Sequence, residues 1–432
     1  MSKVWRAIIC YFVFFTAITL NVGHGQGIIK DTLRLDIHKA ENLFLQSNLQ
    51  IIAQKYNLDA ARALIIQAKL YPNADFYWGN NFYNSRTDQY FPLSLSHTNS
   101  DNNAQISQLI ILGRKIHKQT QIAETNYKLA EDNLYDLLRS LKFALRSSFF
   151  TIYYLWQTAK VYDEEINALK TIVSAYDQVE GKGYVSKAEV VQVQAQLYSL
   201  QNEYQTLIDN INDQQSQLRL LLQSSPNIYI EPLVDTEIVK ADPLVYKLES
   251  LLDSAYLNRT DLMIAKDDLL LSRQNYDLQK SLAIPDITLS ASFVQSSNYV
   301  PDDLNYGIGI PLPLFNRNQG NIKNASVLIQ YTNTQLELTQ KTLEEQVYRA
   351  FQKAIDADKL YKGIDPAFAG NFDRLAKEML DHYMKRNVSL LNFLTFYDSY
   401  KQNIVQLNTI LCNKVNALEN INFLTGTNLF NK

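Results

Sequence analysis

The sequence predicts a mainly α-helical, elongated protein with a small β part. Three observations lead to this fold class. Glycine and proline normally end helices, yet they number only 13 and 10 in 432 residues and cluster in short islands. The stretches between the islands carry heptad patterns of apolar residues. Two of the islands alternate apolar and polar residues, as β-strands do.

The composition excludes several classes of protein. Hydrophobic residues make up 46% of the chain, which is too many for a disordered protein. The series of apolar runs of about 20 residues that a polytopic helical membrane protein needs is missing. A net charge of −3 provides no broad basic surface, so no nucleic-acid partner is expected. The two cysteines and five scattered histidines form no disulfide framework or zinc motif, and no catalytic motif is present. We therefore expect no enzyme, no cofactor and no metal site.

The N-terminal segment has the pattern of a secretory signal peptide. Lys3 and Arg6 precede an apolar run over residues 7–20, and small residues follow it. The run is shorter than the roughly 20 residues of a transmembrane helix. Cys10 lies inside the run and not at its end, so a lipidated N-terminus is not expected. The sequence predicts a signal peptide over residues 1–25.

Very long helices are predicted between the islands. The stretch from residue 114 to residue 180 contains no glycine or proline. A helix of this length extends about 100 Å at 1.5 Å per residue, which indicates a coiled coil or a helical tube. The other stretches without either residue are 28–71, 184–225, 244–284, 321–362 and 371–425.

Two heptad seams repeat at the same phase, 203 residues apart. The first comprises Val190, Val193, Leu197, Leu200, Tyr204, Leu207, Ile211, Gln214, Leu218 and Leu221, and the second comprises Phe393, Phe396, Tyr400, Asn403, Leu407, Ile410, Lys414, Ala417, Ile421 and Leu424. This repetition predicts two copies of one unit. The first copy covers residues 26–222, a proline-bearing linker covers 223–243, and the second copy covers 244–432.

Each copy contains one pair of predicted strands. In the second copy, alternating residues after Pro285 and after a polar loop place apolar side chains on one face. The first copy has one comparable strand at 74–81 and a less regular return strand at 104–112. Strands of about 9–11 residues with one apolar face fit a transmembrane barrel, although a half-buried soluble sheet gives the same alternation. The predicted lipid-facing residues are Ile287, Leu289, Phe293, Tyr306, Ile308 and Ile310.

Four strands do not close a barrel, and open sheet edges do not occur in lipid. The membrane interpretation therefore requires further chains, and three copies would supply twelve strands. A basic run directly after the first strand pair contains Arg114, Lys115, His117 and Lys118. It is interpreted either as an interfacial anchor where a tube leaves the membrane or as a selectivity ring.

The turns between the long helices are the predicted docking sites. In the first copy Ser186 is placed to cap the following helix, with Glu189 completing a capping box. Arg386 in the second copy stands where the first has a glycine, and the neighbouring Asn387 tolerates a left-handed backbone better than most residues. The predicted tip residues are Gly183, Tyr184, Val185 and Ser186 in the first copy and Arg386, Asn387, Val388 and Ser389 in the second.

With these motifs in order, the sequence resembles the TolC-like outer-membrane efflux family over nearly the whole chain after residue 25. The segment Ile111–Lys115 (ILGRK) is similar to the family's exit from strand to helix. Its second-copy counterpart, Pro311–Gly320 (PLPLFNRNQG), is especially similar to the heavy-metal and cation branch. The segment Gly183–Glu189 (GYVSKAE) resembles the family's turn at the periplasmic helix tip.

The resemblance implies a homotrimer with four strands per chain. These strands form a twelve-stranded β-barrel in contact with outer-membrane lipid, and the helices continue as an α-barrel through the periplasm. It implies the channel of a tripartite efflux system, with a periplasmic adaptor at the helix tips and an inner-membrane pump of the RND or ABC type. The family commonly places acidic residues near the closed periplasmic end. Asn392 and Thr395 occupy those positions here, so we expect a gate closed by packing and amide hydrogen bonds.

Two other functions remain open at this point. One is the outer-membrane duct of a type I protein secretion system, and the other is a secreted structural coiled-coil protein without a membrane part. The motif at Pro311–Gly320 favours efflux over protein secretion. The cargo is not encoded in recognisable residues, because in such systems the pump selects it.

Overall fold

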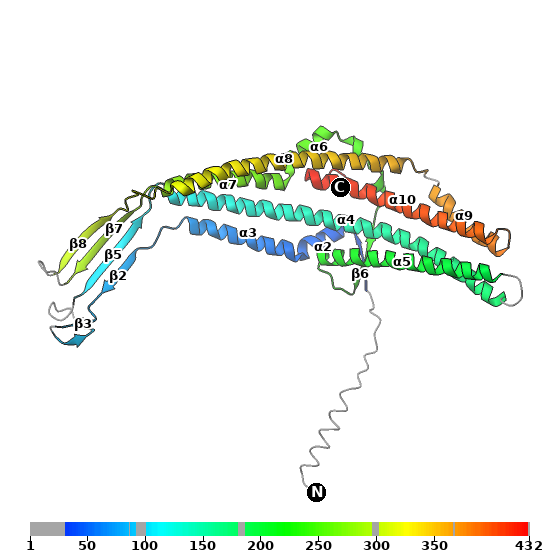
Figure 1. Cartoon of the computed structure of the whole chain (residues 1–432), viewed down its shortest axis with the longest axis horizontal. Helices are drawn as coiled ribbons and strands as arrows, with labels where there is room; N and C mark the ends of the chain where they lie inside the picture. The colour runs from blue at the N-terminus through cyan, green and yellow to red at the C-terminus, as the bar shows by residue number, and fades with distance from the viewer. Residues whose placement is uncertain are drawn as a thin grey trace, which may run out of the picture.

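The computed structural model describes residues 31–85, 87–91, 101–179, 186–295, 302–365 and 368–430. The predicted signal peptide lies outside these residues. The described chain forms a curved rod with a small β-sheet at one end. At the other end of the rod, α4 and α9 end and α5 and α10 begin (Figure 1). The prediction of a mainly helical protein with a small β part is therefore confirmed.

The helices of the first copy are α2 (Ile37–Ser47), α3 (Leu49–Ala68), α4 (Lys115–Val179) and α5 (Lys187–Leu222). The 65 residues of α4 confirm the predicted very long helix. The expectation of a single helix in the stretch 28–71 is wrong, because this stretch contains two helices. Asn48 ends α2 and starts α3, because its side chain accepts hydrogen bonds from the N–H groups of Gln50 and Ile51. Asparagine is a strong N-cap and breaks a helix without glycine or proline.

The helices of the second copy are α6 (Leu248–Asn258), α7 (Thr260–Leu282), α8 (Gln319–Lys362), α9 (Phe368–Met384) and α10 (Leu390–Thr425). The break between α6 and α7 at Arg259 corresponds to the break at Asn48 in the first copy. In both places the backbone N–H of the breaking residue donates to the carbonyl four residues earlier. The copies differ in their long helix, since α4 is continuous whereas its counterpart is divided into α8 and α9 at Gly363.

Two strands from each copy form one antiparallel sheet. The strands are β2 (Asp75–Gly79), β5 (Asn103–Ile110), β7 (Ile287–Val294) and β8 (Asp303–Gly309), in the spatial order β2-β5-β7-β8. The central pairing of β5 with β7 joins the two copies. All four predicted strands are present. In this order β2 and β8 are the edge strands.

Four further β-strands, which form two pairs, were not predicted. Strand β1 (Asp31–Asp36) pairs in parallel with β6 (Ile228–Leu233), and β3 (Tyr83–Asn84) pairs with β4 (Gln89–Tyr90). β6 lies in the predicted linker, next to the short 3-10 helices η1 (Thr236–Lys240) and η2 (Pro243–Val245). The pairing of β1 with β6 joins segments about 200 residues apart, so local pattern gives little signal for it. The boundaries of the two copies stay a prediction.

The heptad seams are confirmed in part. Val193, Leu197, Leu200, Ile211 and Leu218 of α5 are buried as predicted. Near the end of α5, however, Gln215 and Leu222 are the buried residues, where the seam predicted Gln214 and Leu221. In α10 the buried residues Tyr397 and Ile404 likewise replace Phe396 and Asn403. A straight helix drifts by about 20° per heptad, which moves the contact face by one residue over several turns.

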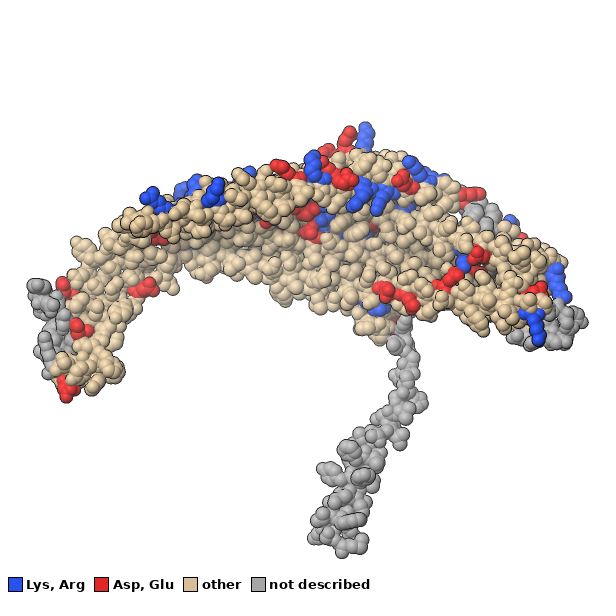
Figure 2. Space-filling view, in the orientation of Figure 1, with Lys and Arg blue, Asp and Glu red and all other residues tan. Residues whose placement is uncertain are grey.

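Charged side chains are distributed unevenly along the rod. Figure 2 shows that they gather along the convex edge over α6 and α8, whereas few appear at the sheet end. None of the helices in the described ranges combines the length and the apolar character that crossing a membrane requires.

Candidate functional sites at the helix tips and the sheet

The first helix tip is capped as the sequence predicts. The Ser186 Oγ accepts a hydrogen bond from the Glu189 N–H at 3.2 Å, and the Glu189 carboxylate accepts one from the Ser186 N–H at 3.0 Å. This reciprocal pair confirms the capping box. Gly183, Tyr184 and Val185 lie outside the described residues, so their assignment to the tip stays a prediction.

The second tip uses a different turn chemistry. Arg386 adopts a left-handed backbone with φ of 60°, and its N–H donates to the Tyr383 carbonyl at 2.9 Å. The left-handed position is therefore Arg386, the residue at the glycine position, and not Asn387. Ser389 caps α10 by accepting from the Asn392 N–H at 3.3 Å. Asn392 stands where the first tip has Glu189, and no return bond to Ser389 is present among the described contacts.

The two copies meet just inside the tips. The hydroxyl groups of Tyr176 on α4 and Tyr383 on α9 contact each other, and the Tyr383 ring stacks on Phe393 with centroids 4.7 Å apart. Burial raises the pKa of both tyrosines, so both hydroxyls are neutral at ordinary pH. A cavity of about 350 Å³ at this place is lined by residues of both copies, namely Ile172, Ala175, Tyr176, Glu189, Tyr383, Met384, Arg386, Val388, Ser389 and Leu390.

The predicted gate residues lie next to this contact. Phe393 is fully buried in the core of the tip half. Asn392 and Thr395 are exposed within the single chain, so neither packs in its core. Their assignment to the gate stays a prediction.

The sheet has one apolar face. Its register aligns Phe76, Ile106, Ala291 and Tyr306 in one row across the four strands. The neighbouring row on the same face contains Trp78, Ala104, Phe293 and Leu304. The opposite face carries serines, amides and glycines, with Tyr77, Leu109 and Val294 among them.

The six predicted lipid-facing residues lie on the apolar face or directly beyond the end of β8. Exposed fractions are 45% for Leu289, 91% for Tyr306, 66% for Ile308 and 48% for Ile310. Ile287 and Phe293 are half-buried in the single chain. Their contact with lipid stays a prediction.

The predicted basic run has a structural role at Lys115. This side chain is only 6% exposed, and its Nζ donates to the Asp286 carboxylate and to the Ile284 carbonyl, both at 2.7 Å. It therefore ties the exit from β5 to the entry into β7, and neither the anchor nor the ring interpretation applies to it. Gly113, directly before the run, has φ of +69°, and an added Cβ would lie 3.2 Å from the Ser281 carbonyl.

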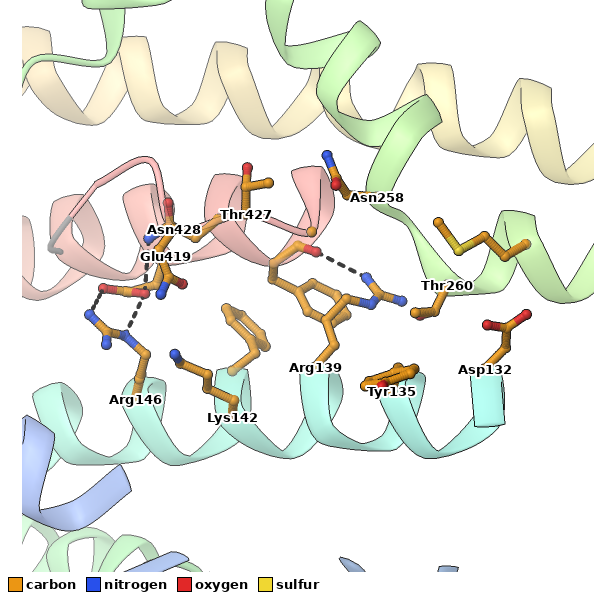
Figure 3. Close-up of a pocket in the computed structure, with 15 residues that line it drawn as sticks. Asp132, Tyr135, Arg139, Lys142, Arg146, Asn258, Thr260, Glu419, Thr427 and Asn428 are labelled. Atoms are coloured by element: carbon orange, nitrogen blue, oxygen red, sulfur yellow. Dashed lines mark hydrogen bonds and ion pairs between the residues drawn. The ribbon is translucent and has the colours of Figure 1, made fainter. Parts of the chain in front are cut away.

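The middle of the rod contains a second, larger cavity. It has a volume of about 560 Å³ and lies between α4, the break between α6 and α7, and the C-terminal end of α10 (Figure 3). Its cationic side chains are already engaged. Arg146 makes hydrogen bonds of 2.7 and 2.8 Å to the Glu419 carboxylate and one of 2.6 Å to Glu41, and Arg139 donates to the Phe423 carbonyl at 3.0 Å. These contacts fix α10 to α4.

Sequence reasoning missed these buried ionic contacts. A further buried ionic contact, made by Lys414, could have been predicted. Lys414 occupies a predicted seam position in a coiled coil whose seam is otherwise apolar or neutral. Lys414 is 1% exposed and pairs with Asp358 of α8 at 2.6 Å. A charged residue at a buried seam position indicates an ionic partner on the facing helix.

Together, these features define a class of protein: a long helical rod that carries a small sheet with one apolar face at one end and paired helix turns at the other. Solved structures of bacterial outer membrane proteins share this architecture. Residues 41–223 match the model of the family described as "Outer membrane efflux protein". The match confirms the resemblance predicted from the sequence.

The chain is also similar to a curated metal resistance protein and to solved structures of outer membrane proteins. The cobalt-zinc-cadmium resistance protein CzcC of Cupriavidus metallidurans is 23% identical over 305 residues, which span 67% of this chain and 66% of CzcC. The outer membrane channel CmeC of Campylobacter jejuni has a similar fold, with a TM-score of 0.72 and 16% identity, covering 90% of this chain and 85% of CmeC. The outer membrane protein VceC of Vibrio cholerae also has a similar fold, with a TM-score of 0.68 and 15% identity, covering 90% of this chain and 96% of VceC.

Proposed function

We propose that this protein is the outer-membrane channel of a tripartite efflux system, a passive export duct that extends into the periplasm. One observation carries the proposal. A single chain joins a four-stranded sheet with one exposed apolar face to a helix of 65 residues, about 100 Å long. The exposed apolar face supports contact of the sheet with lipid, and the length of the rod supports its extension into the periplasm.

Three chains close the barrel in this proposal. The sheet of one chain has two edge strands, β2 and β8, and open edges do not occur in lipid. Joining β8 of one chain to β2 of the next, three times, gives twelve strands without an edge. The exposed apolar side chains of α3 support the same assembly, because Tyr56, Leu64 and Ile66 are 71%, 61% and 66% exposed in one chain. Neighbouring chains cover them in the trimer.

The helix tips are the proposed contact with a periplasmic adaptor, which links the duct to an inner-membrane pump. Each chain supplies two serine-capped helix starts, at Ser186 and at Ser389, so that a trimer presents six. The duct itself performs no chemistry in this proposal. Similarity to CzcC, a cobalt-zinc-cadmium resistance protein, favours a pump that exports metal cations.

A substitution on the apolar face of the sheet tests the membrane assignment. Leu289→Arg places a charge on the proposed lipid face, which costs about 2–4 kcal/mol per chain near the bilayer midplane. We expect heat-modifiable trimers and conductance in planar bilayers for the unmodified protein and loss of both in this variant. The matched control is Ser290→Arg, on the opposite face of the same strand. Normal assembly of Leu289→Arg with failure of Ser290→Arg would invert the facing, and a soluble monomer without channels would contradict the proposed function.

A further inference from the structure

A buried carboxyl group lies in the tip half of the rod, where α4 packs against α5 and α10. Glu165 of α4 is 1% exposed, and its Oε2 atom is enclosed without a hydrogen-bond partner among the described residues. Its neighbours on α4 include Ile166 and Leu169, which belong to the apolar core of this half. An ionised carboxylate is costly in such a place unless a cation is available to it.

The nearby cation is already shared by other groups. The Lys401 Nζ of α10 lies 2.9 Å from the Glu203 carboxylate of α5 and 3.2 Å from the Asp398 carboxylate of α10. The Tyr162 hydroxyl of α4 also donates to Glu203, at 3.3 Å. The cluster therefore contains one lysine and three carboxyl groups, including Glu165, drawn from three helices.

The protonation of Glu165 decides the net charge of this cluster. With Glu165 neutral, the lysine and two carboxylates sum to −1, and with Glu165 ionised the sum is −2. Burial raises the pKa of Glu165 to about 7, and Asp398 and Glu203 act in the same direction against the opposing effect of Lys401. From α10, Tyr397 also faces the group, but its hydroxyl donates to the Ala376 carbonyl of α9 at 3.0 Å and offers Glu165 no proton.

We propose that Glu165 is a proton-dependent latch that holds α10 against α4 and α5 and thereby keeps the tip end of the duct closed. When Glu165 loses its proton to water, the second negative charge favours separation of α10 from α4 so that water reaches the carboxylate. This role rests on the proposed function, because a latch regulates opening only in a duct. The helix contact itself exists independently of that function.

The sign of the pH effect follows from the direction of the shift. The closed packing binds the Glu165 proton more tightly than the hydrated form, whose ordinary pKa is 4.5. The contribution of the latch is therefore fully present below about pH 4.5, declines as pH rises, and is lost above about 7. Closure is firm in acid and opening becomes easier near neutral pH.

The test compares Glu165→Gln with Glu164→Gln in the full chain. Glutamine keeps the shape of the protonated acid, and Glu164 is the exposed neighbour that makes the same chemical change without burial. In planar bilayers we expect the open probability of the unmodified channel to rise about tenfold between pH values of about 5.5 and 8. Glu165→Gln should remain at the low value at every pH, and Glu164→Gln should behave as the unmodified channel.

A second variant and a second measurement keep the proposal testable if Glu165→Gln does not assemble. Glu203→Gln removes one competing carboxylate, so that Lys401 becomes available to Glu165 and the midpoint of the pH dependence should move to lower pH. Amide hydrogen exchange of residues 397–404, corrected for the intrinsic rate, should quicken with rising pH in the unmodified protein and not in Glu165→Gln. Channels whose opening keeps its pH dependence in Glu165→Gln would overturn the latch. An absence of channels would overturn the duct, and pH-dependent exchange in that case would show that the proton-dependent helix contact exists without it.

Discussion

The two halves of α4 pack against their neighbours by different chemistry. Towards the sheet, α4 meets α7 through polar contacts, among them Thr125 with Gln274 at 2.8 Å and Lys128 with Asp267 at 2.9 Å. Towards the tips, α4 meets α5, α9 and α10 through a core of aliphatic and aromatic side chains. One continuous helix therefore makes polar contacts with α7 in one half and packs an apolar core against α5, α9 and α10 in the other.

This difference determines whether each half of α4 is sensitive to changes in side-chain volume or to changes in pH. Apolar packing depends on shape and volume and is insensitive to pH. Buried polar contacts depend on protonation, and each buried polar atom without a hydrogen-bond partner is an exception that costs folding free energy. In the tip half, Glu165 is such an exception beside the apolar core. The sheet half has its own, at Asp132 and Asp267, whose Oδ2 atoms are both enclosed without a hydrogen-bond partner in the described part of the chain.

The largest effect is expected from breaking the apolar half. Phe393 is fully buried, with ring centroids 4.7 Å from Tyr383 and 4.6 Å from Tyr397. Phe393→Ala should lower the free energy of unfolding by about 3–5 kcal/mol, because it leaves a cavity in a packed core. Chemical denaturation of the purified protein in detergent measures this loss. Leu391→Ala, at an exposed position two residues earlier, should change it little, and equal losses in both variants would contradict the assignment of the core.

A smaller, pH-dependent effect is expected in the polar half. Burial raises the pKa of Asp132 to about 6, and the neighbouring Asp267 carboxyl group adds to the shift. The folded protein therefore binds the Asp132 proton more tightly than the unfolded chain does. The stability that this proton contributes is fully present below about pH 3.8 and is lost as pH rises past about 6. Asp132→Asn, which resembles the protonated acid, should flatten the dependence of the melting temperature on pH between these values. Glu131→Gln is the control and should retain the slope, so a retained slope in Asp132→Asn would exclude this pair as its source.

The smallest effect is expected at the second tip and has the opposite sign. Arg386 holds a left-handed backbone that costs a side-chain-bearing residue about 1–2 kcal/mol, whereas glycine adopts it freely. Glycine also has more freedom in the unfolded chain, so Arg386→Gly should stabilise the protein by less than about 1 kcal/mol. Thermal unfolding measures the change. Asn387→Gly, at a residue with ordinary backbone geometry, should destabilise slightly instead, and stabilisation by both would show that the turn does not distinguish the two positions.

Much of the architecture was predictable because it depends on local pattern. Scarce glycine and proline predicted α4, and period-two alternation predicted β7 and β8. The capping box at Ser186 followed from residues three apart. By contrast, the break at Asn48 was not predicted, because it contains neither glycine nor proline.

The candidate sites were predictable to a lesser extent. The sequence placed the two tips at equivalent positions of the two copies, but it did not indicate that Tyr176 and Tyr383 meet between them. It also treated Lys115 as part of a basic surface, whereas the fold brings Asp286 to it from 171 residues away and buries the lysine. An ionic partner from the other copy has no local signal, because the distance along the chain does not limit which side chains meet.

By itself the sequence determined the longest helix and the apolar face of the strands β7 and β8, since each depends on the spacing of neighbouring residues along one helix or strand. Only the tertiary structure decided which seam residues are buried at the ends of α5 and α10, because the twist of packed helices accumulates over many turns. It also decided that one lysine, Lys401, serves two carboxylates while Glu165 stays enclosed without a hydrogen bond to its Oε2 atom. Protonation depends on burial and on every charge within a few ångströms, and those distances exist only once the helices have packed.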